Sequence, residues 1–212
     1  MRNIKDELQN IILGDESVGA SGQLKKVQIF LRGNAETGVG TQNQQRLKSE
    51  EAAELIRFAS REKHFYEPEI REDDFIASGA EQRVYRYDGE HVIKTNGGIF
   101  YEYWLDYFNS LLIHNYFFPT TAYSFLGFKI IEDELYAVVK QEFIVTTDST
   151  NLAAIKQFLE YNEFINNRNN DYINTALGII FEDLHDENVL SNKGVLFFID
   201  TIFYLTGNFY LL

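Results

Sequence analysis

The sequence contains no cysteine, which excludes disulfide bonds, thiolate metal sites and a cysteine nucleophile. Basic residues are also scarce, because 19 Lys and Arg stand against 32 Asp and Glu and give a formal net charge of −13. A nucleic-acid partner is not expected from this balance, since neutralising phosphates requires many Lys and Arg. No apolar run approaches the roughly 18 residues that would cross a membrane, and residues 1–6 do not lead into a signal-peptide core. We therefore expect a soluble, cytoplasmic protein of a bacterium or phage, with no membrane partner.

Apolar and aromatic side chains, by contrast, are plentiful, at 45% and 15% of the 212 residues. This content is sufficient for a packed core, so global disorder is not expected. The length fits one domain, alone or with a small extension. Pro68 marks a boundary in the pattern, because residues 1–70 are polar with helical periodicity and strand patterns begin only afterwards. We expect an accessory helical segment over residues 1–70 and a compact α+β domain over residues 71–212.

The N-terminal segment is expected to form short helices. Apolar residues recur at helical spacing from Ile4 to a stop at Gly14. Residues 22–32 fit either a helix or a strand. Residues 33–45 fit a loop, and residues 50–63 fit a helix. The simpler expectation is that these helices pack on the rest of the chain, and a separate interaction role is the alternative.

Five short strands are expected after Pro68, at residues 75–77, 83–87, 91–94, 127–131 and 135–140. Asp88-Gly89 joins the second and third strands, and this dipeptide is a strong signal for a tight hairpin. Gly79 lies in the turn between the first two strands, and Lys94 ends the third.

Two helices are expected among these strands and after them, at residues 99–118 and 151–167. Aromatic and aliphatic residues of the first recur at helical spacing, a pattern more typical of a core than of a cofactor site. Glu102 borders this apolar face. Gln141 and Phe143 lie in the stretch that connects the last of the five strands to the second helix.

Residues 181–200 contain three polar side chains that are expected to act together. Asp183 and Asn188 share one loop, and residues 189–191 and 195–199 read as a hairpin closed by a turn at residues 192–194. A hairpin brings its outer ends together, so Asp200 is expected to return beside Asn188. The carboxylate and the amide oxygen suit Mg²⁺, a hard cation that prefers oxygen ligands. Asp183 is then left to orient or deprotonate a hydroxyl.

The Asp-Leu-His-x-x-Asn form of residues 183–188 resembles the catalytic loop of the protein-kinase-like superfamily, in the form of its aminoglycoside-phosphotransferase-like branch. More closely, residues 72–203 resemble the kinase found in polyvalent proteins of phages and mobile elements. The residues that carry this resemblance are 114–123, Gly127-Phe128, Gln141 and 182–188. It implies a two-lobed fold: a five-stranded antiparallel N-lobe with one helix (71–140), a hinge (141–150), and a reduced helical C-lobe with a catalytic-loop hairpin (151–212).

The resemblance also implies an ATP- and Mg²⁺-dependent phosphotransferase acting on a Ser, Thr or Tyr hydroxyl of a protein. In that case Asp183 accepts the proton of the hydroxyl, while Asn188 and Asp200 bind the metal. The nucleotide is held by residues of the N-lobe and hinge: Gly79, Lys94, Glu102, Gln141 and Phe143. Lys94 contacts the phosphates and pairs with Glu102, and His185 is expected to be structural.

Three hypotheses remain open at this stage. Little of the printed sequence follows Asp200, where full protein kinases carry an activation segment and a helical platform for peptides. The chain is therefore either an active phosphotransferase or a pseudokinase that binds nucleotide or partner proteins without catalysis. In the remaining alternative it is a structural protein in which the polar residues coincide by chance.

Overall fold

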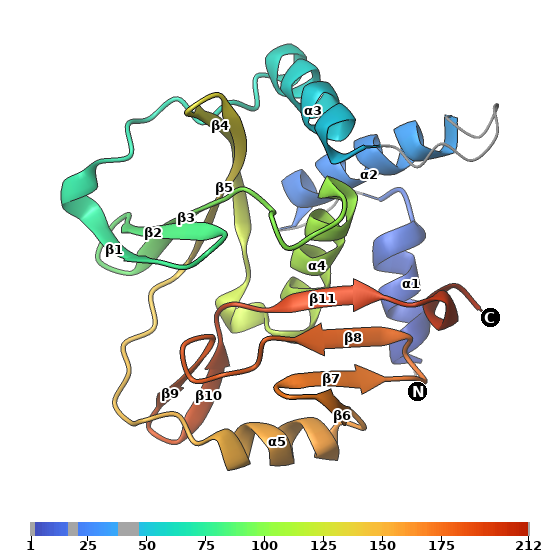
Figure 1. Ribbon diagram of the computed structural model, residues 1–212, viewed down its shortest axis with the longest axis vertical. Helices are drawn as coiled ribbons and strands as arrows, with labels where there is room; N and C mark the ends of the chain where they lie inside the picture. The colour runs from blue at the N-terminus through green and yellow to red at the C-terminus, as the bar shows by residue number, and fades with distance from the viewer. Residues whose placement is uncertain (1–2, 17–20, 38–46, 212) are drawn as a thin grey trace. The chain divides into compact units, whose positions relative to one another are not determined.

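The computed structural model describes residues 3–16, 21–37 and 47–211 (Figure 1). Within these residues the chain is a mixed α/β protein with five α-helices and antiparallel sheets. It divides into two compact units. Unit 1 comprises Met1–Glu16, Asn109–Ala122 and Ile144–Leu212, and unit 2 comprises Ser17–Phe108 and Tyr123–Phe143.

Unit 2 is built on a five-stranded antiparallel sheet with the strand order β1-β2-β3-β5-β4. Its strands are β1 Phe75–Ser78, β2 Gln82–Arg86, β3 His91–Asn96, β4 Ser124–Ile131 and β5 Glu134–Glu142. The five predicted strands are confirmed, with ends that differ by a few residues. The Asp88-Gly89 turn forms as expected, because the Asp88 carboxylate accepts hydrogen bonds of 2.7 Å from the N–H groups of Glu90 and His91. β3 is central, and its residues 92–96 are all buried.

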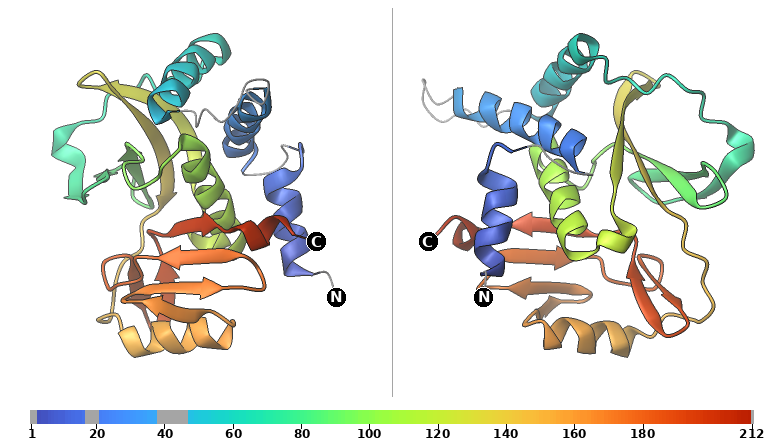
Figure 2. Two further views of the ribbon diagram at one scale, coloured as in Figure 1. Left: turned by 45° about the vertical axis from the view of Figure 1, so that its right-hand side comes forward. Right: turned by 180° about the vertical axis from the view of Figure 1, so that it is seen from behind.

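Three helices belong to unit 2 in whole or in part: α2 Gly22–Thr37, α3 Lys48–Glu62 and α4 Trp104–Phe117, of which α4 contributes to both units. α2 and α3 pack against the edge strand β4 (Figure 2), and Phe30 stacks on Phe58 with ring centroids 4.5 Å apart. The stretch that read as a helix or a strand is therefore helical. It continues to Thr37, into residues predicted as a loop, and the rest of that loop (38–46) lies outside the described residues.

α4 begins at Trp104, later than the sequence predicted. Gly98 has a φ of +65°, and the N–H of Tyr101 bonds back to its carbonyl over 3.0 Å, so the chain turns before the helix starts. The Glu51 carboxylate then accepts a 2.5 Å hydrogen bond from the Trp104 N–H and caps the helix. Lys48 of α3 donates to the Gly98 and Tyr101 carbonyls. The start of α4 is thus fixed by side chains from α3.

Unit 1 contains a second antiparallel sheet with the order β11-β8-β7-β6, and a separate β9–β10 hairpin. Its strands are β6 Ile165–Arg168, β7 Asp171–Asn174, β8 Ile179–Glu182, β9 Val189–Asn192, β10 Val195–Phe198 and β11 Ile202–Leu205. α5 Leu152–Tyr161 precedes them, and 3-10 turns lie at Pro119–Thr121 and Gly207–Tyr210.

The helical C-lobe expected from the sequence is wrong in its content. Over residues 151–211, all described, one α-helix is followed by six strands. The predicted helix over 151–167 ends at Tyr161, because Glu163 adopts a φ of +62° and the Asn162 side chain caps the Phe158 carbonyl. The core between these elements is aromatic: Phe181 stacks on Phe203 at 4.1 Å between ring centroids.

α1 Ile4–Leu13 also belongs to unit 1. Asn3 caps its first turn, and Gly14 ends it as predicted. Lys5 Nζ donates to the Asn208 carbonyl over 2.8 Å, and Tyr116 donates its hydroxyl to the Glu7 carboxylate over 2.8 Å. The first helix is therefore tied to the end of the chain and to α4.

Candidate functional site

Asp183 directly follows β8 and occupies a constrained backbone position. Its φ is +62°, in the left-handed region, which Asp tolerates better than most non-glycine residues. The conformation is held on both sides, because the Asp183 N–H donates to Asp171 Oδ1 over 3.1 Å and the Leu184 N–H donates to the Asn170 carbonyl over 3.1 Å. Leu184 is buried, whereas the side chain of Asp183 stays about half exposed (50%). The loop therefore presents this carboxylate to solvent from a fixed backbone.

Asn188 is bonded to Asp183 through its side-chain amide. Its Nδ2 lies 2.8 Å from the Asp183 carbonyl and 2.9 Å from Asp183 Oδ2. Both partners are acceptors, which assigns the amide nitrogen to this side and turns Oδ1 away from Asp183. Among the described residues no hydrogen bond to Oδ1 is recorded. An amide oxygen in this orientation is suited to a cation.

His185 contacts the same carboxylate. Its Nδ1 accepts from the Glu187 N–H over 3.3 Å, and its Nε2 lies 3.1 Å from Asn188 Nδ2. Nε2 lies 3.3 Å from Asp183 Oδ1. His185 thus contacts one carboxylate oxygen of Asp183, and Asn188 contacts the other. The structural role expected for His185 is therefore to position the Asp183 carboxylate.

The β9–β10 hairpin returns Asp200 to Asn188, as predicted. Lys193 and Gly194 have φ values of +50° and +75°, the pattern of a tight hairpin turn that matches strand twist. At the open end, the carbonyl of Asn188 accepts from the N–H groups of Ile199 and Asp200, over 3.0 and 3.2 Å. Asp183, Asn188 and Asp200 therefore form one hydrogen-bonded cluster within unit 1.

The donor set of this cluster fits Mg²⁺. In the described part of the chain no three His, Asp or Glu side chains are grouped to hold a metal. Mg²⁺ does not require such a cage, because it commonly binds one or two protein oxygens together with substrate phosphates and water. Asn188 Oδ1 and the Asp200 carboxylate would supply that number of ligands.

The surroundings of Asp183 are acidic. Burial raises the pKa of the Glu182 carboxyl, and the nearby charges of Asp171 and Asp183 raise it further. This shift shows that negative charge accumulates where β7 and β8 reach the loop. A cation bound beside Asp183 would relieve it.

Lys94 lies at the centre of the unit 2 sheet. On β3 it stands between Val84 of β2 and Val139 of β5, and it is 3% exposed. Its ammonium lies 5.4 Å from the ring centroid of Tyr123, within cation–π distance. A solvated lysine would occupy an exposed strand end. The buried position of Lys94 instead confines its charge to one side of the sheet.

The other residues predicted to contact the nucleotide also lie in unit 2. Gln141 is buried opposite Val92, and the Phe143 N–H donates to the Glu90 carbonyl over 2.7 Å. Gly79 closes the β1–β2 turn by donating to the Gln82 carbonyl over 2.9 Å. No atom lies within 4 Å of a Cβ placed on Gly79, so neither packing nor a positive φ requires glycine there.

Glu102 does not pair with Lys94. It is exposed in the turn before α4, and its carboxylate accepts a 2.7 Å hydrogen bond from the neighbouring Tyr103 hydroxyl. The physical reason is the late start of α4 at Trp104, which leaves Glu102 outside the helix whose apolar face it was expected to border.

The sequence analysis did not identify the roles of three residues at these sites: Asp171, Lys48 and Glu51. Asp171 supports Asp183 from β7, and the α3 pair fixes the start of α4. Their partners lie 12 or more residues away along the chain, and no local motif marks such contacts. None of the helices that the structure describes is long and apolar enough to cross a membrane.

An antiparallel sheet with a buried lysine on its central strand, and a loop and hairpin that join two aspartates through an asparagine, are features found in kinase-like phosphotransferases. Comparison with known families leads to a specific one. Residues 48–207 match the family described as a serine/threonine/tyrosine kinase found in polyvalent proteins, and the chain belongs to this family. Neither the curated proteins nor the solved structures contain a match. Membership implies use of a nucleotide and a divalent metal in general, and the matched range includes α3.

Proposed function

We propose that the protein is an ATP- and Mg²⁺-dependent kinase that transfers the γ-phosphate to a Ser, Thr or Tyr hydroxyl of a protein. The observation that carries this proposal is the position of Asn188, which is bonded to Asp183 through its side chain and to Asp200 through its backbone. Asn188, itself a candidate metal ligand, thereby holds the candidate base Asp183 near the second candidate ligand, Asp200.

In the proposed reaction the substrate hydroxyl attacks the γ-phosphorus, the bond to the bridging β,γ-oxygen breaks, and ADP leaves. Asp183 accepts the hydroxyl proton on its half-exposed carboxylate, which His185 and Asn188 hold in one orientation. Asn188 Oδ1 and the Asp200 carboxylate would hold Mg²⁺, which would supply positive charge beside the phosphates. Most of the rate enhancement then comes from positioning and charge stabilisation.

Lys94 contributes a fixed positive charge for the α- and β-phosphates. Its buried place on β3 restricts the side chain, so little conformational entropy is lost when phosphate is bound. The backbone around Gln141 and Phe143 is proposed to contact the base, and the turn that contains Gly79 to cover the phosphates.

A nucleotide-binding pseudokinase is the second candidate. Two observations favour it: Glu102 bonds to Tyr103 instead of Lys94, and the β1–β2 turn has no structural need for Gly79. Both features affect how firmly phosphates are held, while leaving the Asp183–Asn188–Asp200 cluster in place.

Thermal stabilisation by ATP and Mg²⁺ tests the site first. The wild type is expected to show a metal-dependent rise in Tm that Lys94→Ala and Asp200→Asn both lose. Asp186→Asn removes an equal charge from the same loop at an exposed residue outside the cluster, and should behave as wild type.

Transfer of labelled γ-phosphate to a mixture of bacterial proteins separates the two candidates. In an active kinase, Asp183→Asn keeps the Tm shift and loses transfer. A Tm shift without transfer in the wild type identifies the pseudokinase, and no shift at millimolar nucleotide refutes both.

A further inference from the structure

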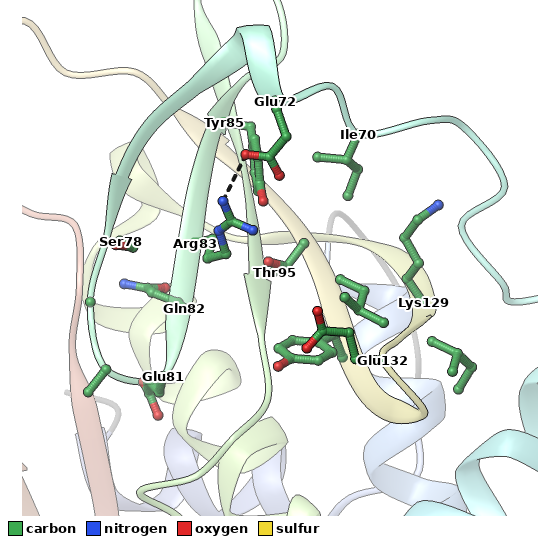
Figure 3. Close-up of a pocket in the computed structure, with 15 residues that line it drawn as sticks. Ile70, Glu72, Ser78, Glu81, Gln82, Arg83, Tyr85, Thr95, Lys129 and Glu132 are labelled. Atoms are coloured by element: carbon green, nitrogen blue, oxygen red, sulfur yellow. Dashed lines mark hydrogen bonds and ion pairs between the residues drawn. The ribbon is translucent and has the colours of Figure 1, made fainter.

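A pocket of about 720 Å³ lies in unit 2, between the β1–β2 turn and the β4–β5 turn (Figure 3). Thr95 lines it, and because successive side chains of a strand point to opposite faces, Thr95 and Lys94 face different sides of β3. The turn at residues 78–82 forms one wall and residues 130–132 at the β4–β5 turn form another. The pocket is therefore distinct from the proposed nucleotide site, although it shares the β1–β2 turn with it.

Thr95 provides a buried polar group at this pocket. The residue is 1% exposed, and its Oγ1 has no hydrogen-bond partner among the described residues. A buried hydroxyl without a partner is unfavourable, and few such groups persist in native proteins unless water or a ligand satisfies them. A donor that enters the pocket would find an acceptor there.

The two cations that line the pocket are already engaged. Arg83 forms a 2.8 Å ion pair with Glu72, and its guanidinium lies 5.4 Å from the ring centroid of Tyr85. Lys129 donates to the carbonyls of Tyr66 and Pro68 over 3.3 and 3.0 Å. Neither is directed at a ligand, so an anionic occupant is not favoured.

Negative charge, in contrast, is available at the rim. Glu132 is exposed at the β4–β5 turn with a φ of +50°, and no ion pair is recorded for it in the described chain. It is followed by Asp133 and Glu134. In the segment that leads into β1, Glu72 also lines the pocket, where it is paired with Arg83.

Apolar and aromatic surface completes the lining. Tyr85 and Tyr136 present rings, and Ile70, Ile130 and Ile131 present aliphatic groups. Long basic side chains match this combination, because their aliphatic stems pack on apolar surface while the charged end seeks carboxylates and aromatic faces.

We propose that this outer-face pocket binds a basic segment of a partner protein, with an Arg or Lys side chain directed toward Glu132 and Thr95 Oγ1. Charge complementarity selects a basic peptide over a nucleic acid or an anionic metabolite. The proposal does not depend on phosphate transfer, since the pocket lies on the face opposite Lys94. A bound segment would touch the β1–β2 turn, so its affinity and that of a nucleotide would be linked reciprocally.

The probe is a fluorescein-labelled peptide with two Arg and two Lys residues spaced by Gly and Ser, compared with the same peptide carrying Glu at those positions. Anisotropy with the full chain, at low and at physiological salt, measures affinity. Glu132→Lys and Thr95→Val are the test variants, and Glu160→Lys on α5 is the matched charge control. A two-dimensional NMR spectrum locates the bound peptide.

Saturable binding of the basic peptide alone is expected, with amide shifts at Thr95 and Tyr136. Glu132→Lys should lower the affinity about tenfold, or about 1.4 kcal/mol. Thr95→Val, which conserves shape and removes the hydroxyl, should also weaken binding while preserving the fold by circular dichroism. Absence of saturable binding overturns the proposal, as does an affinity that falls equally in Glu160→Lys or remains unchanged in both test variants.

Discussion

Asn188 Nδ2 donates a 2.9 Å hydrogen bond to Asp183 Oδ2. The carboxylate proposed as the catalytic base is therefore oriented by the residue whose amide oxygen is proposed to bind the metal. Orientation of the base and occupancy of the metal site are expected to change together when Asn188 changes.

Replacing Asn188 with Ala should destabilise the protein and abolish the effect of metal. The substitution removes two hydrogen bonds to Asp183, and at about 1 kcal/mol each the loss of unfolding free energy is expected to be about 1–2 kcal/mol. Urea denaturation with and without ATP and Mg²⁺ measures both effects. Glu187→Ala is the neighbouring control, and a metal-dependent Tm shift that persists in Asn188→Ala would count against this residue as a ligand.

Replacing His185 with Ala should reduce phosphate transfer more than nucleotide binding. The ring contacts Asp183 Oδ1 at 3.3 Å, so its loss frees one carboxylate oxygen without removing a metal ligand. We expect kcat to fall about tenfold, less than the roughly 10²–10⁴-fold that a general base itself contributes, with KM for ATP nearly unchanged. His185→Gln, which retains a donor, should recover part of the loss. Equal changes in kcat and in ATP affinity would indicate a collapsed loop instead.

Replacing Glu51 with Ala should loosen the start of α4. The buried carboxylate accepts the Trp104 N–H, and loss of a helix cap typically costs about 0.5–2 kcal/mol. Hydrogen exchange at Trp104 and chemical denaturation report the local and the global effect. Glu67→Ala, an exposed acidic residue outside the helices, serves as the control. Unchanged exchange at Trp104 would show that the cap is dispensable.

Replacing Glu182 with Gln should stabilise the protein at neutral pH. Burial, followed by Asp171 and Asp183, raises the pKa of this carboxyl in the folded state above that of the unfolded chain. The folded state then binds the proton more tightly, so Glu182 lowers stability as the pH rises through the window above its ordinary pKa. Denaturation curves should show the advantage of Glu182→Gln near pH 7 and its disappearance below the ordinary pKa of Glu. A gain that does not vary with pH would exclude titration of Glu182 as the cause.

Replacing Gly127 with Ala should be strongly destabilising. Gly127 lies at an irregularity of β4 with a φ of +142°, and an added Cβ would stand 2.6 Å from the His64 carbonyl and 2.9 Å from the Tyr66 N–H. Strain and steric overlap together are expected to cost more than about 2 kcal/mol. Gly89→Ala is the matched control, because no atom lies within 4 Å of a Cβ there. Similar denaturation midpoints for the two variants would contradict the close approach of residues 64–66 to β4.

Features that depend on neighbouring residues could be predicted from the sequence. The alternation in β1–β5 and the turn residues Asp88-Gly89 encode the five strands locally. The return of Asp200 to Asn188 also follows from local rules, because a hairpin closed at Lys193-Gly194 brings its two outer ends side by side. The family resemblance, carried by residues 114–123, Gly127-Phe128, Gln141 and 182–188, was likewise confirmed by the match over residues 48–207.

Features that depend on distant partners could not. After α5 the chain forms a sheet where a helical lobe was expected, because β8 pairs with β11 and β7 and the strands cover a Phe-rich core. Glu102 lost its expected role because Glu51, 53 residues before Trp104, sets where α4 begins. The contacts of His185 and Asp171 with Asp183, and the outer-face pocket, could be identified only from the tertiary structure.

The sequence by itself determined the kinase family, the strands of the first sheet and the order of Asp183, Asn188 and Asp200 along one loop and hairpin. The tertiary structure decided which atoms of those residues meet, where α4 starts and what lies behind Lys94. The physical reason is range: turn chemistry and side-chain alternation act over a few residues, whereas caps, buried hydroxyls and sheet partners depend on groups that only folding brings together.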